Sequence, residues 1–172
     1  MNVRRFRSTA CIALAGLVLT PPLASAQTVF VVRHAEKISE SDQRLTDAGR
    51  ERATRLAKML SAAGIRAIYA TDTERAKDTA GPLAERLHLA VTTYDVGAGM
   101  AKGAPDATAF AAQLRRDHPN DAVLVVGHSN TLPAILKALG CQEEVTIAAQ
   151  QYDDLFVVVP GSGGATLVRL KY

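Results

Sequence analysis

The chain has 172 residues, a length that suits a single domain. Its 20 Lys and Arg residues exceed its 17 Asp and Glu residues by three. Three arginines within the first seven residues, Arg4, Arg5 and Arg7, account for that excess, so the rest of the chain is formally neutral. The charge balance therefore gives no support for a protein that binds nucleic acid or an anionic membrane.

Residues 1–26 have the pattern of a secretory signal peptide. The early arginines precede an apolar run at 9–20, and Ala-Ser-Ala at 24–26 resembles a cleavage site. The run is shorter than the roughly 20 residues that a spanning helix needs. An uncleaved membrane anchor is one alternative, and a lipid anchor on Cys11 is a weaker one. We expect an exported protein, periplasmic or secreted, with no stable membrane insertion once the signal is removed.

The domain predicted at 27–172 begins with alternating strand and helix patterns. Residues 28–32 form an apolar, β-branched run that predicts a strand buried on both faces. Residues 46–63 have apolar positions at helical spacing, and residues 65–70 predict a second strand. Residues 73–87 predict another helix, which Pro82 should kink or divide.

The second half continues the alternation. It has a short strand at 91–94, a Gly- and Ala-rich loop at 97–105, a helix at 106–116, a buried strand at 122–126 and a helix at 130–139. Strands that alternate with helices in this way are typical of a layered α/β protein with a mostly parallel sheet.

Two last strands, at 155–159 and 165–170, surround Gly-Ser-Gly-Gly at 161–164. A nucleotide-binding loop would lie between a strand and a helix, so this segment is predicted to be a tight turn. The hairpin should add an antiparallel pair to the sheet. The predicted fold is therefore a three-layer α/β/α domain with a mostly parallel central sheet.

Histidines and arginines gather at the predicted strand ends. Arg33 and His34 follow the first strand, and His128 and Ser129 follow the strand at 122–126. Ligand sites in open α/β sheets lie at the carboxyl ends of the strands. Arg75 lies in the first turn of a predicted helix, where a cation is unfavourable unless an anion compensates it. Each feature alone is weak, but together they predict an anion-binding site.

Four motifs in chain order resemble the histidine phosphatase superfamily, which has the phosphoglycerate mutase-like fold. They are Arg-His-Ala-Glu-Lys at 33–37, Leu-Thr-Asp-Ala-Gly at 45–49, Thr-Glu-Arg-Ala-Lys-Asp-Thr-Ala at 73–80 and Val-Gly-His-Ser at 126–129. Two positions depart from the family pattern, since Ala35 stands where Gly is usual and Asp78 where Gln is frequent. The Arg-His-Ala-Glu-Lys version resembles short, often exported members.

The resemblance implies that His34 attacks phosphorus and forms a phosphohistidine. It also implies that Arg33, Arg75 and His128 stabilise the charge on the phosphoryl oxygens, and that the helix start at Ser129 helps to bind phosphate. Guanidinium suits this task because its planar fork matches phosphate geometry. No metal and no cofactor are required by such a reaction.

The proton donor for the leaving group is less clear. The resemblance favours Asp95, which the sequence alone could equally place in a solvated turn. Glu36, next to the nucleophile, is a second candidate, although it could instead pair with Lys37 or Arg44, or hold a loop. If neither donates, the substrate must have a good leaving group. Residues 152–154 precede a strand and could orient the site.

The sequence thus predicts a metal-independent phosphatase that hydrolyses a phosphomonoester or a related phosphoryl bond. No long lid is evident, so the substrate could be a phosphorylated small molecule, a glycan phosphate or a phosphoprotein. The alternative is a non-catalytic protein of the same fold that binds phosphate esters. A serine hydrolase using Ser129 with His128 ranks lower, because adjacent residues do not easily form the required hydrogen bond.

Overall fold

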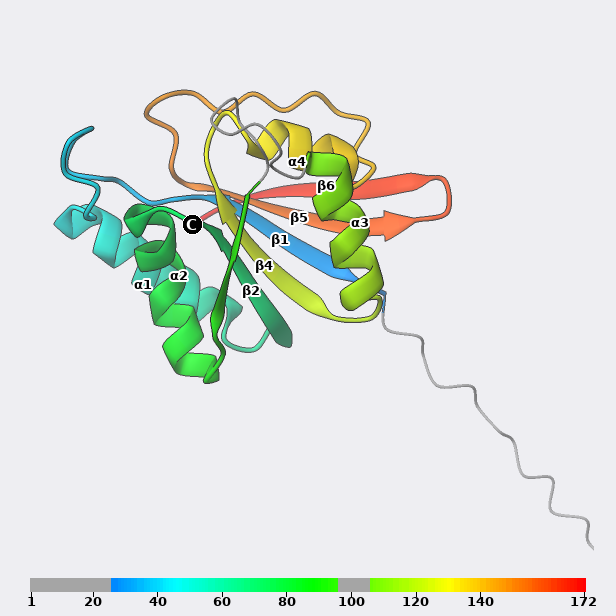
Figure 1. Ribbon diagram of the computed structural model, residues 1–172, viewed down its shortest axis with the longest axis horizontal. Helices are drawn as coiled ribbons and strands as arrows, with labels where there is room; N and C mark the ends of the chain where they lie inside the picture. Colours follow the sequence, from blue (N-terminus) through cyan, green and yellow to red (C-terminus); the bar gives the residue numbers. More distant parts are fainter. Residues whose placement is uncertain (1–25, 96–105) are drawn as a thin grey trace, which may run out of the picture.

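The computed structural model describes residues 26–95 and 106–172. Most of the predicted signal peptide and the predicted loop at 97–105 lie outside the described residues. Within the described part, six strands form one sheet in the order β3-β2-β4-β1-β5-β6, and four helices cover it (Figure 1). The arrangement confirms the predicted α/β fold.

Parallel pairing joins the first four strands, which are β1 (Thr28–Arg33), β2 (Ile65–Thr71), β3 (Val91–Tyr94) and β4 (Ala122–Gly127). The remaining two strands, β5 (Asp154–Gly161) and β6 (Gly164–Lys171), pair antiparallel, and β5 is also antiparallel to β1. Gly161 pairs with Gly164, so the predicted turn is a tight two-residue hairpin loop. The last hairpin is therefore antiparallel, as the sequence predicts.

The helices form two layers, one on each face of the sheet (Figure 1). The layer of α1 (Asp47–Leu60) and α2 (Glu74–Leu87) packs on one face, and that of α3 (Ala107–Asp117) and α4 (Leu132–Ala138) packs on the other. Alternate residues of each strand point to opposite faces. Val31 of β1 thus joins the core beneath α3 and α4, whereas Val32 joins the core beneath α1 and α2.

Pro82 does not divide α2, which runs unbroken from Glu74 to Leu87. A proline removes one backbone hydrogen bond from a helix interior. Ala76, Ala80 and Leu83 are fully buried against the sheet, and this packing holds the helix together across the proline.

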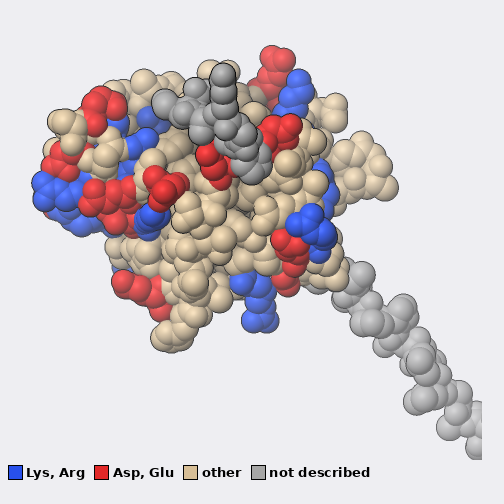
Figure 2. Space-filling model, viewed as in Figure 1, with Lys and Arg blue, Asp and Glu red and all other residues tan. Residues whose placement is uncertain are grey.

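The surface of the described residues carries charges of both signs. Figure 2 shows acidic and basic side chains interspersed over the face that it presents. None of the helices in the described ranges combines the length and the apolar character needed to cross a membrane.

Candidate active site

A cavity of about 820 Å³ opens at the carboxyl ends of β1, β2, β3 and β4. This is the place where parallel α/β sheets bind their ligands. The sheet order brings these strand ends together, although they are far apart in the sequence. Six of the residues singled out from the sequence line this cavity: Arg33, His34, Arg75, Asp95, His128 and Ser129.

His34 follows β1 and is almost completely buried, with 3% of its surface exposed. Its Nδ1 lies 2.7 Å from the carbonyl oxygen of Ala35. A carbonyl can only accept, so Nδ1 carries the proton and Nε2 keeps its lone pair. Burial, helped by the neighbouring His128 and Arg75, lowers the pKa of His34 to about 3. The ring is therefore neutral at physiological pH, with one nitrogen available as a nucleophile.

The helices α1 and α2 hold the segment that follows His34. The Ala35 amide donates to Thr79 Oγ1 at 2.9 Å, and the Thr79 hydroxyl donates to the Arg75 carbonyl at 2.7 Å. A Cβ at Gly49 would lie 2.4 Å from the Glu36 carbonyl oxygen, so only glycine lets α1 approach this closely. These contacts explain why motifs far along the sequence accompany the histidine.

His128 follows β4 and faces His34, with 5.2 Å between the ring centroids. Its Nδ1 accepts a hydrogen bond from Arg75 at 3.2 Å, so its Nε2–H donates to Thr71 Oγ1 at 2.8 Å. Burial, helped by the charges of Arg75 and Arg33, lowers the pKa of His128 to about 4. The second histidine is therefore also neutral. Thr71, the last residue of β2, was not singled out from the sequence.

Arg33 and Arg75 are not neutralised by acids. Neither forms an ion pair within the described ranges 26–95 and 106–172. In both side chains Nε is buried without a hydrogen-bond partner among the described residues. An unsatisfied buried donor is unfavourable, more so on a charged group. A bound oxyanion would supply the missing acceptors.

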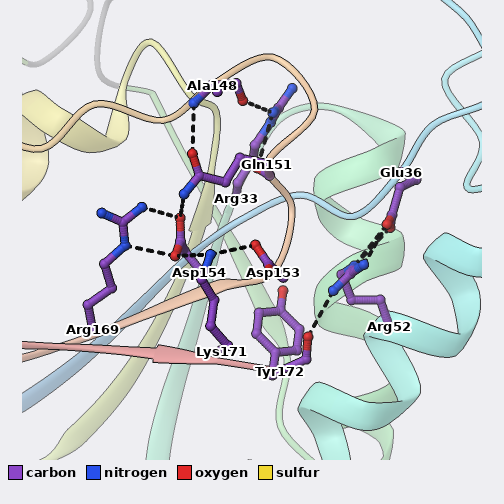
Figure 3. A network of polar contacts seen from close by, with 10 residues as sticks. All are labelled: Arg33, Glu36, Arg52, Ala148, Gln151, Asp153, Asp154, Arg169, Lys171 and Tyr172. Atoms are coloured by element: carbon purple, nitrogen blue, oxygen red, sulfur yellow. Dashed lines mark hydrogen bonds and ion pairs between the residues drawn. The ribbon is translucent and has the colours of Figure 1, made fainter.

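Glu36 lies outside the cavity lining, in contrast to Asp95. Its carboxylate binds Arg52, with Oε1 2.7 Å from Nη2, so its partner is neither Lys37 nor Arg44 (Figure 3). Burial alone would raise the pKa of Glu36, but the hydrogen bonds from Arg52 keep it below the ordinary value. Arg52 therefore keeps Glu36 ionised, and of the two predicted donors it is Asp95 that lines the cavity.

Further residues line the cavity, among them Lys37, Glu40 and Tyr152. Lys37 ends the first motif and forms an ion pair at 2.6 Å with Glu40, three residues later. Tyr152 lies near His34, with 5.9 Å between the ring centroids. Tyr152 belongs to the segment at 152–154 that, judged from the sequence, could orient the site, and Lys37 belongs to the first motif, whereas Glu40 had no signal in the sequence. Among the described residues, no three His, Cys, Asp or Glu side chains are grouped as a metal site would require.

Residues 29–96 match the model of the histidine phosphatase superfamily (branch 1). No curated protein sequence matches the chain at a significant level. Among solved structures, the chain is similar to the protein histidine phosphatase SixA complexed with tungstate, at 18% identity over 84% of this chain and 96% of that chain, with a TM-score of 0.65.

Two further structures have the same architecture. The mycobacterial glucosyl-3-phosphoglycerate phosphatase is 17% identical over 86% of this chain and 99% of that chain, with a TM-score of 0.61. The phosphoserine phosphatase of Entamoeba histolytica is 14% identical over 83% of this chain and 95% of that chain, with a TM-score of 0.59. The chain thus has the fold of these proteins over nearly their whole length.

Proposed function

We propose that the protein is a phosphatase of the histidine phosphatase superfamily, which hydrolyses its substrate through a phosphohistidine on His34. One observation carries the proposal: a buried, neutral histidine lines a cavity beside two arginines whose buried Nε atoms lack partners among the described residues. The match of residues 29–96 to the superfamily model supports it.

In the first step, the Nε2 lone pair of His34 attacks phosphorus while the bond from phosphorus to the leaving oxygen breaks. Arg33 and Arg75 bind the equatorial oxygens, where negative charge accumulates. His128 is held by Thr71 and Arg75 at a fixed position beside the reacting ring. Arg33, held by backbone carbonyls, and Arg75, held by His128, are thus donors fixed in place before the reaction. Such donors need no reorganisation as the charge develops, which is why they stabilise the transition state.

The leaving oxygen then needs a proton, unless its own pKa is low. Asp95 is the proposed donor, because it lines the cavity at the end of β3. In the second step, water attacks phosphorus, the bond from phosphorus to Nε2 breaks, and phosphate leaves. The Asp95 carboxylate takes a proton from that water, which restores the starting state.

The reaction as proposed requires no metal, because the two guanidinium groups supply the positive charge that a metal would otherwise supply. The physiological substrate is proposed to be a phosphorylated small molecule, a glycan phosphate or a phosphoprotein. The names of the similar structures span this range, from a protein histidine phosphatase to a glucosyl-3-phosphoglycerate phosphatase.

Export to the periplasm or the medium is also proposed, as is a relation to short exported superfamily members. Both rest on the sequence pattern of residues 1–26 and of the first motif. Fractionation of cells that express the full chain checks export, since the processed protein should appear outside the cytoplasm. Unprocessed protein that stays in the cytoplasm would contradict the proposal.

The test is turnover of an activated aryl phosphate by the purified protein, with and without a chelator. We expect turnover that the chelator leaves unchanged and that His34→Ala abolishes. His88→Asn is the matched control, because His88 ends α2 and does not line the cavity. Substantial turnover by His34→Ala would refute the proposed nucleophile. Vanadate binding without turnover would instead favour a phosphate-ester-binding protein of the same fold.

A further inference from the structure

The segment before β5 holds the Arg33 guanidinium through neutral groups. Nη1 of Arg33 donates to three backbone carbonyl oxygens, those of Ala148 at 3.0 Å, Ala149 at 2.9 Å and Gln151 at 3.2 Å. The guanidinium carbon also lies 4.1 Å from the centre of the Tyr152 ring. Carbonyls and a ring orient an arginine without neutralising it, so Arg33 keeps its full charge for an anionic ligand.

The Gln151 side chain holds these carbonyls in place. Its Oε1 accepts a hydrogen bond from the Ala148 amide at 3.0 Å, and its Nε2 donates to the Asp154 carboxylate. The backbone N–H of Gln151 also donates to the Ala148 carbonyl at 3.1 Å, which closes the turn. A side-chain amide can accept from a backbone N–H and donate to a carboxylate at once, through two different atoms. A carboxylate or a thioether at this position could not make both bonds.

Asp154 anchors this arrangement to the sheet (Figure 3). Its carboxylate is buried and accepts from Arg169 Nε and Nη2, each at 2.8 Å, and from Lys171 Nζ at 2.8 Å. Both cations belong to β6, which pairs with β5 along its length. A chain of contacts therefore runs from β6 through Asp154 and Gln151 to the carbonyls that hold Arg33.

We propose that Gln151 is a positioning residue that orients Arg33 through the carbonyls of the 148–151 turn, with Asp154 as its anchor. The inference rests on the proposed function, in which Arg33 binds the phosphoryl group. Gln151 itself does not line the cavity, so its effect must pass through another residue. Because Nη1 is occupied by carbonyls, the orientation of the turn decides where the unpaired Nε of Arg33 points.

The test is a double-mutant cycle read out as tungstate affinity, which requires no turnover. Gln151→Met keeps the length of the side chain but removes both hydrogen bonds. We expect it to weaken tungstate binding about tenfold. The estimate is by analogy with metal sites, where loss of a residue that orients a metal ligand weakens binding about tenfold or more. In the Arg33→Ala background, the same change should weaken binding less than about twofold, because the residue through which it acts is gone.

Gln142→Met is the matched control, since Gln142 lies on an exposed loop outside the cavity and bonds only the Gly140 carbonyl among the described residues. It should leave tungstate affinity unchanged. The inference would be overturned if Gln151→Met weakened tungstate binding equally in the unaltered protein and in Arg33→Ala, or weakened it in neither. Thermal unfolding of each variant checks that it folds. If Gln151→Met does not, Gln151→Asn, which retains an amide too short to reach both partners, replaces it.

The result can be separated from a failure of the proposed function. Turnover by the unaltered protein that His34→Ala abolishes tests the function, whereas the tungstate cycle tests how Arg33 is positioned. If His34→Ala abolishes turnover but Gln151→Met binds tungstate as tightly as the unaltered protein does, the proposed function stands and the positioning role is refuted.

Discussion

The neutral state of His34 in the folded protein should make folding stability depend on pH. In the unfolded chain the imidazole has its ordinary pKa of about 6.5, whereas burial lowers the pKa of His34 to about 3 in the folded state. Between these values the unfolded chain binds more protons, so the free energy of unfolding rises with pH. The stability is complete above the unfolded pKa and is lost as pH falls toward the folded one.

The magnitude follows from the unfolded pKa. A pH of 5 is about 1.5 units below that pKa, and each unit corresponds to about 1.36 kcal/mol. The free energy of unfolding should therefore be about 2 kcal/mol lower at pH 5 than at pH 7. His34→Phe keeps a planar ring of similar size that cannot ionise. Other titrating groups, His128 included, are present in both proteins, so their contributions cancel in the comparison.

Urea unfolding of both proteins at pH 7 and pH 5 measures this difference. We expect the unaltered protein to lose about 2 kcal/mol more than His34→Phe between the two pH values. A difference below about 0.5 kcal/mol would refute the reasoning, because His34 would then titrate alike in both states. A histidine of that kind would be mostly protonated at pH 5 and could not attack phosphorus there.

Three further predictions concern the cavity and the Glu36–Arg52 ion pair. Arg75→Ala should lower kcat for an aryl phosphate about 10²–10³-fold, as loss of one transition-state donor does, and a fall below about threefold would mean that Arg75 does not touch the phosphoryl group. Arg55→Ala, on the exposed part of α1, is its control and should have no effect. Asp95→Asn should slow turnover of an alkyl phosphate about 10²-fold but affect an activated aryl phosphate little, because only the alkyl leaving group needs a proton. Glu36→Gln should leave the turnover of both substrates unchanged, and should lower the free energy of unfolding in urea by about 1–2 kcal/mol, because it weakens the pair with Arg52. If Asp95→Asn and Glu36→Gln slowed turnover of the alkyl phosphate equally, the assignment of Asp95 would be contradicted.

The layered fold could be predicted because its signals are local. Apolar β-branched runs such as 28–32 and 122–126 become the central strands β1 and β4, and helical spacing marks the helices that cover them. The predicted and observed helix ends differ by a few residues. The helix predicted at 46–63, for example, is α1, which ends at Leu60. Of the two outcomes expected at Pro82, a kink or a division of the helix, the division was wrong, because packing against the sheet outweighs one missing hydrogen bond.

The site could be predicted only in part, for a physical reason. Arg33, His34, Arg75 and His128 follow strand ends or open a helix, so the topology alone brings them to one cavity. Their roles in catalysis remain predictions.

Contacts made through tertiary structure leave no comparable signal. Arg52 reaches Glu36 from α1, sixteen residues away, and the carbonyls that hold Arg33 belong to a turn more than 100 residues later. Every residue has a backbone carbonyl, so the residue type at a position does not indicate that its carbonyl will bind an arginine.

The most direct test of the central claim is to locate the phosphoryl group during turnover. The protein is mixed with an activated aryl phosphate, quenched within the first turnovers and analysed by peptide mass spectrometry. The account predicts phosphate on His34 and none on the corresponding peptide of His34→Ala. Phosphate on His128 or Ser129, or steady turnover with no phosphorylated residue, would contradict it.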